Sequence, residues 1–264
     1  MIGLLFSAAS LIAMAALEPP NHTSAPALTL RAELTWGAMG PPREHSRYSA
    51  RDAVFYRLVI GGLSTDKLGN VHCVIRTDLR RPDGRLETVQ RHERPALSLW
   101  GAATLSCSFC YTIDSDLAAG AFALVVTVVD RYTGQEASVE LPLEVQPKEF
   151  ALLGPVFYAD PKGTMPCGPG GVCGLSLFLK VGVIGHGLAN GKSNARCVVE
   201  VFEPDGRVVH SVRSEPLTLA GPLVSFDIAL PLMKSGDFRL RITVLDDATG
   251  QRRTVETPLR VRES

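Results

Sequence analysis

The chain has 264 residues, of which 45% are hydrophobic and 20% are charged. Its 27 basic and 27 acidic residues give a formal net charge of zero, so no overall field attracts it to nucleic acid or to an anionic membrane. The length allows one large or two ordinary domains with packed cores.

The first element is an apolar run over residues 2–17, which ends at Glu18 and two prolines. This run is short for a membrane span, and Ala13-Met14-Ala15 fits a signal-peptidase site. We therefore expect residues 1–17 to be a signal peptide and the protein to be exported to the periplasm, the cell surface or the medium. Because no Lys or Arg precedes the run, an uncleaved anchor is the alternative.

Strand-like segments follow, in which apolar and polar residues alternate. From Leu28 to Trp36 every second residue is apolar, which is typical of a strand with one buried and one wet face. Further segments of this kind are predicted near residues 54–61, 71–79, 86–92, 104–113, 121–130 and 136–145. Seven short strands separated by turn residues, with almost no helical period, indicate an antiparallel β-sandwich.

The pattern then repeats. GAFALVVTVVDRYTGQ, Gly120 to Gln135, returns 116 positions later as GDFRLRITVLDDATGQ, Gly236 to Gln251. A period this long indicates a duplicated domain rather than a stacked array of short repeats. We predict two domains, residues 28–145 and 150–261, joined by a linker of four residues.

The two copies also predict which side chains face the core. Phe122, Leu124, Val126 and Val128 stay apolar in the second copy. The alternating positions Ala121, Ala123 and Val125 become Asp237, Arg239 and Arg241. A strand position that accepts Arg faces water, so these alternating positions point away from the core. In the first copy this outward set is unusually apolar, and we predict that it is an interaction surface for another chain: Ala121, Ala123, Val125 and Val129. The alternative is that the segment 37–53, flanked by Trp36 and containing Tyr48, covers these residues.

The repeated motif Gly-x-Phe-x-Leu-x-Val-Thr-Val-x-Asp-x-x-Thr-Gly resembles the last hairpin of bacterial immunoglobulin-like and fibronectin-type-III-like modules. The tandem arrangement resembles that of two-domain secreted bacterial proteins. The resemblance implies an all-β protein of two tandem immunoglobulin-like antiparallel β-sandwich domains after an N-terminal signal segment. The chain departs from antibody-type domains at Thr127 and Thr243, where a strand-F cysteine would be expected, and at Phe122 and Phe238, which lack a tyrosine-corner hydroxyl.

Six cysteines in an exported chain favour disulfides. Cys73 and Cys107 alternate in phase with core residues, so a bridge between the sheets is one candidate. Cys167 and Cys173 bracket a Gly-rich loop that the first copy lacks, and they form the second candidate pair. Cys197, the counterpart of Cys73, is predicted to be a buried thiol.

Metal sites are the competing interpretation. Zinc could use His72, Cys73, Cys107 and Cys110, or else Cys167, Cys173 and His186, although the sulfurs of a Cys-x-x-Cys in a strand point to opposite faces. Calcium could use a set of five carboxylates, for which turn capping is the simpler explanation at the last three: Asp114, Asp116, Asp130, Asp246 and Asp247.

No motif indicates catalysis. The sequence contains no G-x-S-x-G, no H-E-x-x-H and no phosphate-binding glycine loop, so we predict neither an enzyme nor a small-molecule cofactor. We expect a non-catalytic scaffold or adhesion module that binds a protein partner or itself. The main alternative is a cell-envelope glycan-binding module whose platform uses Trp100, Tyr111 or Tyr132. A metal-dependent hydrolase is the less favoured third possibility.

Overall fold

The computed structural model describes residues 27–38, 40–97, 104–147, 149–189, 192–215 and 223–264, and their regular elements are all β-strands. This confirms the predicted all-β fold class. Within the described residues no helix is long or apolar enough to span a membrane. The predicted signal peptide, residues 1–17, lies outside the described residues.

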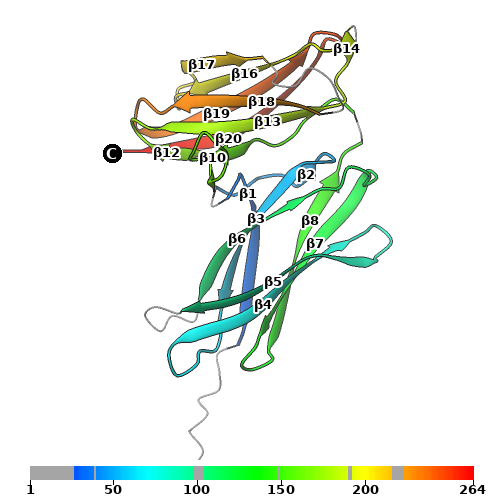
Figure 1. Cartoon of the computed structure of the whole chain (residues 1–264), viewed down its shortest axis with the longest axis vertical. Helices are drawn as coiled ribbons and strands as arrows, with labels where there is room; N and C mark the ends of the chain where they lie inside the picture. Colours follow the sequence, from blue (N-terminus) through cyan, green and yellow to red (C-terminus); the bar gives the residue numbers. More distant parts are fainter. Residues whose placement is uncertain (1–26, 39, 98–103, 148, 190–191, 216–222) are drawn as a thin grey trace, which may run out of the picture.

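The N-terminal half contains two facing sheets (Figure 1). The smaller sheet has the order β1 (Thr29–Thr35), β3 (Ala53–Gly61), β6 (Leu105–Thr112). The larger sheet has the order β2 (Arg47–Tyr48), β8 (Glu136–Val145), β7 (Gly120–Asp130), β4 (Asn70–Arg80), β5 (Leu86–Leu97). Each of the seven predicted strands of this half corresponds to one of these elements, and β2 is the addition.

The C-terminal half is built in the same way. Its first sheet has the order β11 (Pro166–Cys167), β10 (Val156–Tyr158), β13 (Ser176–Ile184), β18 (Leu223–Pro231), with β9 (Ala151–Leu152) also paired to β13. Its second sheet has the order β12 (Gly170–Val172), β20 (Gln251–Arg262), β19 (Gly236–Asp246), β16 (Ala195–Phe202), β17 (Val208–Ser214). A separate short hairpin joins β14 (Leu188–Ala189) to β15 (Lys192–Ser193).

The larger sheets of the two halves correspond strand for strand, as β8-β7-β4-β5 and β20-β19-β16-β17. In both, the long strands are antiparallel, as predicted. In both, a strand of two or three residues pairs in parallel at the edge: β2 with β8, and β12 with β20. Strands this short have no period that a sequence pattern could reveal.

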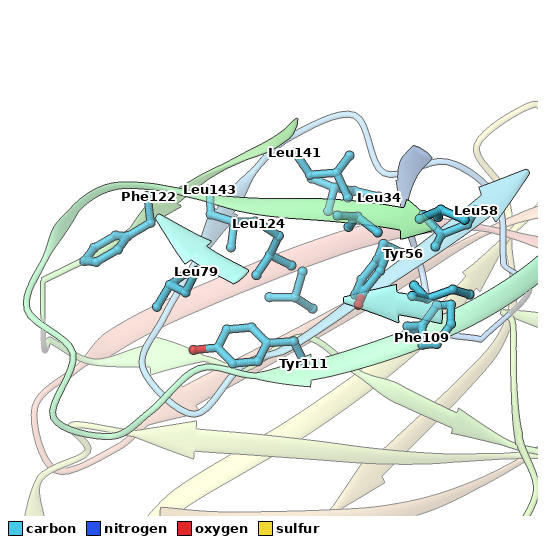
Figure 2. Packing of buried hydrophobic residues seen from close by; sticks show 14 of the residues in the cluster. Leu34, Tyr56, Leu58, Leu79, Phe109, Tyr111, Phe122, Leu124, Leu141 and Leu143 are labelled. Carbon is cyan, nitrogen blue, oxygen red and sulfur yellow. The ribbon is translucent and has the colours of Figure 1, made fainter. Parts of the chain in front are cut away.

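Each half has its own hydrophobic core. Leu124, Val126 and Val128 on β7 are fully buried, and so are Leu240, Ile242 and Val244 on β19, which confirms the predicted alternation. Figure 2 shows Leu124 and Leu143 from the larger sheet of the N-terminal half packing toward aromatic residues of the smaller sheet. Side chains of this kind each contribute about 1.5–3 kcal/mol when fully buried.

The repeated hairpin ends in the same tight turn in both halves. Asp130 accepts the N–H of Gly134 at 2.8 Å with its backbone carbonyl, and Asp246 accepts that of Gly250 at 2.7 Å. The two glycines have φ of 73° and 72°, a left-handed conformation that strongly favours glycine. The Asp-x-x-Thr-Gly motif is therefore explained by turn geometry.

The two halves touch at their junction. Gly37, at φ 76°, lies so close to the C-terminal half that a Cβ atom there would come 2.5 Å from the carbonyl oxygen of Cys167. Trp36, Phe55 and Leu153 are buried without belonging to either core. Phe55 alternates with the core residues of β3 and so points away from its own core.

Candidate interaction surface

The predicted interaction residues lie along the outer face of β7. Ala121 is exposed, and Val125 and Val129 are partly exposed. Ala123 is only 4% exposed, because its short side chain lies between the larger Arg80 and Pro142 of the adjacent strands. The accessible apolar strip is therefore smaller than predicted and consists of Ala121, Val125 and Val129.

Acidic residues border this strip on one side. The outer face of β8 carries Glu136, Glu140 and Glu144, all exposed, and the strand has no basic residue. Arg80 on β4 forms an ion pair with Glu140 at 2.5 Å, and Arg47 on β2 forms one with Glu144 at 3.2 Å. Glu136 has no ion-pair partner among the residues that the structure describes. We call the outer face of β7 and β8 the acidic face.

The segment 37–53 does not cover the strip. Its strand β2 pairs with the edge of β8, at Arg47↔Glu144 and Tyr48↔Val145, and so extends the sheet sideways. Trp36 and Tyr48 are buried at the junction, where the Arg43 guanidinium stacks on both rings at 4.4 and 4.1 Å. The expectation that this segment covers β7 is wrong, because strand pairing takes it to the sheet edge.

The corresponding face of the C-terminal half is basic. Arg239 and Arg241 on β19 occupy the positions of Ala123 and Val125. Both guanidiniums lie over the ring of Phe202, at 5.3 and 4.3 Å, and both form ion pairs with Glu256. On β20 the outer face adds Arg252, Arg260 and Arg262. We call the outer face of β19 and β20 the basic face.

All six cysteines are free thiols in the structure. Cys73 and Cys197 are fully buried, as predicted, and burial raises the pKa of Cys197 to about 12. Burial, together with the neighbouring Cys73, raises the pKa of Cys107 to about 11, so these two thiols lie close enough to influence each other. Cys110 is exposed on the opposite face of β6. The Cys73–Cys107 bridge stays a prediction.

The loop between Cys167 and Cys173 has more structure than its glycines suggest. Cys167 belongs to β11, which pairs with β10, and Gly170–Val172 forms β12, which pairs with β20. The loop thereby connects both sheets of the C-terminal half, and both cysteines pack against the core. Strand pairing already orders the loop, so a bridge between Cys167 and Cys173 is not needed for this; the bridge itself stays a prediction.

Two of the five proposed calcium ligands serve the hairpin turns instead. The Asp130 carboxylate accepts the backbone N–H of Ser64 and of Tyr132, and the Asp246 carboxylate accepts that of Gly187 and the hydroxyl of Thr249. Burial alone would raise the pKa of both carboxyls, but these hydrogen bonds outweigh it and lower both pKa values. Each carboxylate thus ties a hairpin turn to a loop that follows a strand of the facing sheet.

The zinc candidates do not converge. His72 points out from β4 and pairs with Glu93 at 2.8 Å, whereas the adjacent Cys73 points into the core. His186 lies near Asp246, which pairs with Gln251, the first residue of β20. The backbone N–H of Cys173 bonds to the carbonyl of Arg262, the last residue of β20. Eleven residues of strand separate these points by roughly 36 Å. Among the described residues no three His, Cys, Asp or Glu side chains gather.

Asp52 is a buried carboxylate that sequence analysis missed. It accepts the N–H of Ser49 at 3.0 Å and the N–H of Gly154, 102 residues away in the C-terminal half. Burial raises the pKa of Asp52, and these N–H groups, with the Arg43 guanidinium, offset only part of this effect. No sequence pattern joins Asp52 to Gly154, because their contact depends on how the two halves meet.

Two open cavities flank the junction. The first has a volume of about 790 Å³ and lies between Arg57 of the N-terminal half and the loop and strand residues Cys167–Val172 and Pro258–Arg260. The second has a volume of about 400 Å³ and is lined by Arg43, Asp52 and Arg253 among others. Glycine, proline and arginine dominate the lining of the first cavity, which also includes Cys167 and Asp237.

Of the aromatic residues considered for a glycan platform, Tyr111 is 6% exposed and belongs to the N-terminal core, so that expectation is wrong for this residue. Tyr132 is 47% exposed at the hairpin tip, beside His72. Trp100 lies outside the described residues.

No protein-family model matches the sequence, and no curated protein sequence matches it. The solved structures similar to this chain include the C-terminal domain of the Streptococcus agalactiae AgI/II polypeptide BspA. That domain is 9% identical, with a TM-score of 0.32, over 88% of this chain and 100% of the domain. A second structure, BspA_C_WT, is 9% identical, with a TM-score of 0.30, over 87% and 99% of the two chains.

A red sea bream transglutaminase is also similar, at 10% identity and a TM-score of 0.31. The match covers 90% of this chain but only 31% of the transglutaminase. Structural similarity this weak does not indicate a shared activity.

Proposed function

We propose that this chain is an exported, non-catalytic binding or adhesion module made of two immunoglobulin-like domains, residues 28–145 and 150–261. The two separate cores and the matching strand orders of the larger sheets support this division. Rigid sandwiches of this kind present sheet faces and loops to partners.

The acidic face carries the proposal. An outward apolar strip in the middle of a sheet costs solubility unless a partner uses it, and the counterparts of Ala121 and Val125 in the C-terminal half are charged, whereas that of Val129 is Leu245. Val125 is central, because it lies between Asp78 on β4 and Glu140 on β8. An apolar centre with a polar rim is the usual anatomy of a protein–protein interface.

The buried carboxylates support a non-catalytic role. A general acid or base works best with a pKa near the working pH, whereas Asp130 and Asp246 have lowered pKa values and accept several hydrogen bonds. Asp52 has a raised pKa, but both of its oxygens already accept backbone N–H groups, one from Ser49 and one from Gly154 of the other half.

The test is Val125→Arg. We expect it to abolish capture of a partner from the cell envelope, or self-association, because a charge replaces the centre of the contact. The melting temperature should stay within a few degrees of the wild type, since surface substitutions change stability by about 0.5 kcal/mol or less. The matched control is Val59→Arg, which places the same charge at a 39% exposed valine on the outer face of the opposite sheet.

An unchanged pull-down and an unchanged sedimentation profile for Val125→Arg would contradict the proposal. Equal losses for Val59→Arg would also contradict it, because the effect would then not be specific to the acidic face. Mass spectrometry of the exported protein, with and without reduction, would determine the mature N-terminus and any bridges.

A further inference from the structure

The acidic face and the basic face differ in net charge, although Glu140 and its counterpart Glu256 carry the same sign. Counted with the 116-residue offset, Glu136 corresponds to Arg252 and Glu144 to Arg260, while the uncharged Gln146 corresponds to Arg262. On the inner strands, the uncharged Ala123 and Val125 correspond to Arg239 and Arg241, while Ala121 corresponds to Asp237. Two sheets of the same architecture thus present complementary outer surfaces.

Ion pairs within the chain leave charge uncompensated on both faces. On the basic face, Glu256 is shared by Arg239 and Arg241, and Asp237 pairs with Arg260 at 2.7 Å. Arg252 and Arg262 have no ion-pair partner within the described parts of the chain. On the acidic face the same holds for Glu136. A partner surface of opposite sign would therefore add ion pairs without breaking existing ones.

The apolar groups of the two faces also suit each other. The strip of Ala121, Val125 and Val129 lacks long side chains, so it can pack against the aliphatic parts of the arginine side chains on the basic face. The Arg239 and Arg241 guanidiniums lie over the ring of Phe202, at 5.3 and 4.3 Å, and Pro258 on the adjacent strand is exposed. Small apolar residues opposite large stacked ones allow close packing at the centre of a contact.

We infer that the acidic face binds the basic face of a second copy of this chain. The inference rests on the proposed function, because it names the partner of the same surface. A second copy supplies the complementary face, and the formal net charge of zero means that overall repulsion does not oppose association. Each copy carries both faces, so the contact forms either a closed pair or a chain of copies.

The experiment is a charge exchange in the full exported chain, followed by sedimentation equilibrium at low salt. Glu136→Lys reverses one unpaired charge of the acidic face, and Arg252→Glu reverses its counterpart on the basic face. We expect each variant alone to self-associate about tenfold more weakly than the wild type. An equimolar mixture of the two should regain association, since the Arg252→Glu chain keeps an unaltered acidic face, the Glu136→Lys chain keeps an unaltered basic face, and the inferred contact joins these two faces.

Two matched controls carry the same changes in charge elsewhere: Asp116→Lys and Lys67→Glu, both at exposed loop positions. Their association should equal that of the wild type, and raised salt should weaken wild-type association, because screening reduces attraction between exposed charges. A monomeric wild type at high micromolar concentration, or a mixture that fails to regain association, would overturn the inference. If the wild type is monomeric while Val125→Arg still loses a different envelope partner, the proposed function stands and only the second copy is rejected.

Discussion

The β7–β8 and β19–β20 hairpins have similar core-facing side chains, but their solvent-facing side chains differ in net charge. Leu124 and Leu240 are both fully buried at corresponding positions, whereas Val125 and Arg241, one residue further along, differ completely in chemistry. The core position is constrained by close packing in both halves, while the outer position needs only to be compatible with a strand. The difference between the copies therefore indicates where each half meets its surroundings.

The largest expected effect on stability concerns the core-facing residues that the two hairpins have in common. We expect Leu124→Ala and Leu240→Ala each to lower the free energy of unfolding of its own half by about 2–5 kcal/mol, because each removes buried surface and leaves a cavity. Chemical denaturation followed by far-UV circular dichroism would measure this. If either substitution cost less than about 1 kcal/mol, the two cores would not be equivalent at this position.

The second prediction concerns the cysteines, which differ between the two halves. Cys73 lies near Cys107, whereas the C-terminal half has Val224 in place of Cys107, so a bridge at this position is possible only in the N-terminal half. If that bridge forms after export, it should stabilise this half by about 3–4 kcal/mol, through the entropy lost by the unfolded chain. Denaturation with and without reductant measures the difference.

The matched control for the bridge is Cys107→Val, which copies the arrangement of the C-terminal half. In this variant reductant should leave the stability of the N-terminal half unchanged. A bridge absent from the mass spectrum of the oxidised exported protein would refute the prediction directly.

The turn aspartates should behave alike in both halves. Asp130→Ala and Asp246→Ala each leave backbone N–H groups without their acceptor, at an expected cost of about 1–3 kcal/mol near neutral pH. Because the folded pKa of each carboxyl lies below its unfolded value, this stabilisation is present above the unfolded pKa and is lost as the pH falls through the folded pKa. The difference between wild type and variant should therefore shrink on acidification, and a constant difference would contradict the assignment.

Much of the fold could be predicted because the same alternation of apolar and polar residues occurs in both copies, so each buried position is indicated twice. Positions such as Val126 and Ile242, apolar in both, are buried, and the turn glycines follow from the Asp-x-x-Thr-Gly motif. The edge strands β2 and β12 could not be predicted, since two or three residues carry no period and their parallel pairing depends on the opposite end of each half.

The candidate surface was predicted only in part, for the same reason. Alternation identifies the outward positions of β7, but not that Arg80 and Pro142 shade Ala123, which depends on strand register. The burial of Tyr111 and the contact of Asp52 with Gly154 also depend on distant residues. The alternating charges of β8 and β20 were present in the sequence, and comparing the two copies for sign as well as polarity would have found the complementary faces.

The smallest expected effect on stability comes from exchanging the outer residues. In Val125→Arg/Arg241→Val, the second change removes the 2.6 Å ion pair with Glu256 and the stacking on Phe202, each worth about 0.5–1 kcal/mol at a partly exposed site. The first change places a guanidinium between Asp78 and Glu140, where it can recover a similar ion pair. The unfolding free energy should therefore change by less than about 1 kcal/mol in total, although the acidic face is altered. A loss above about 2 kcal/mol in denaturation would mean that Val125 supports the fold rather than a contact, and that the two outsides differ for reasons of packing.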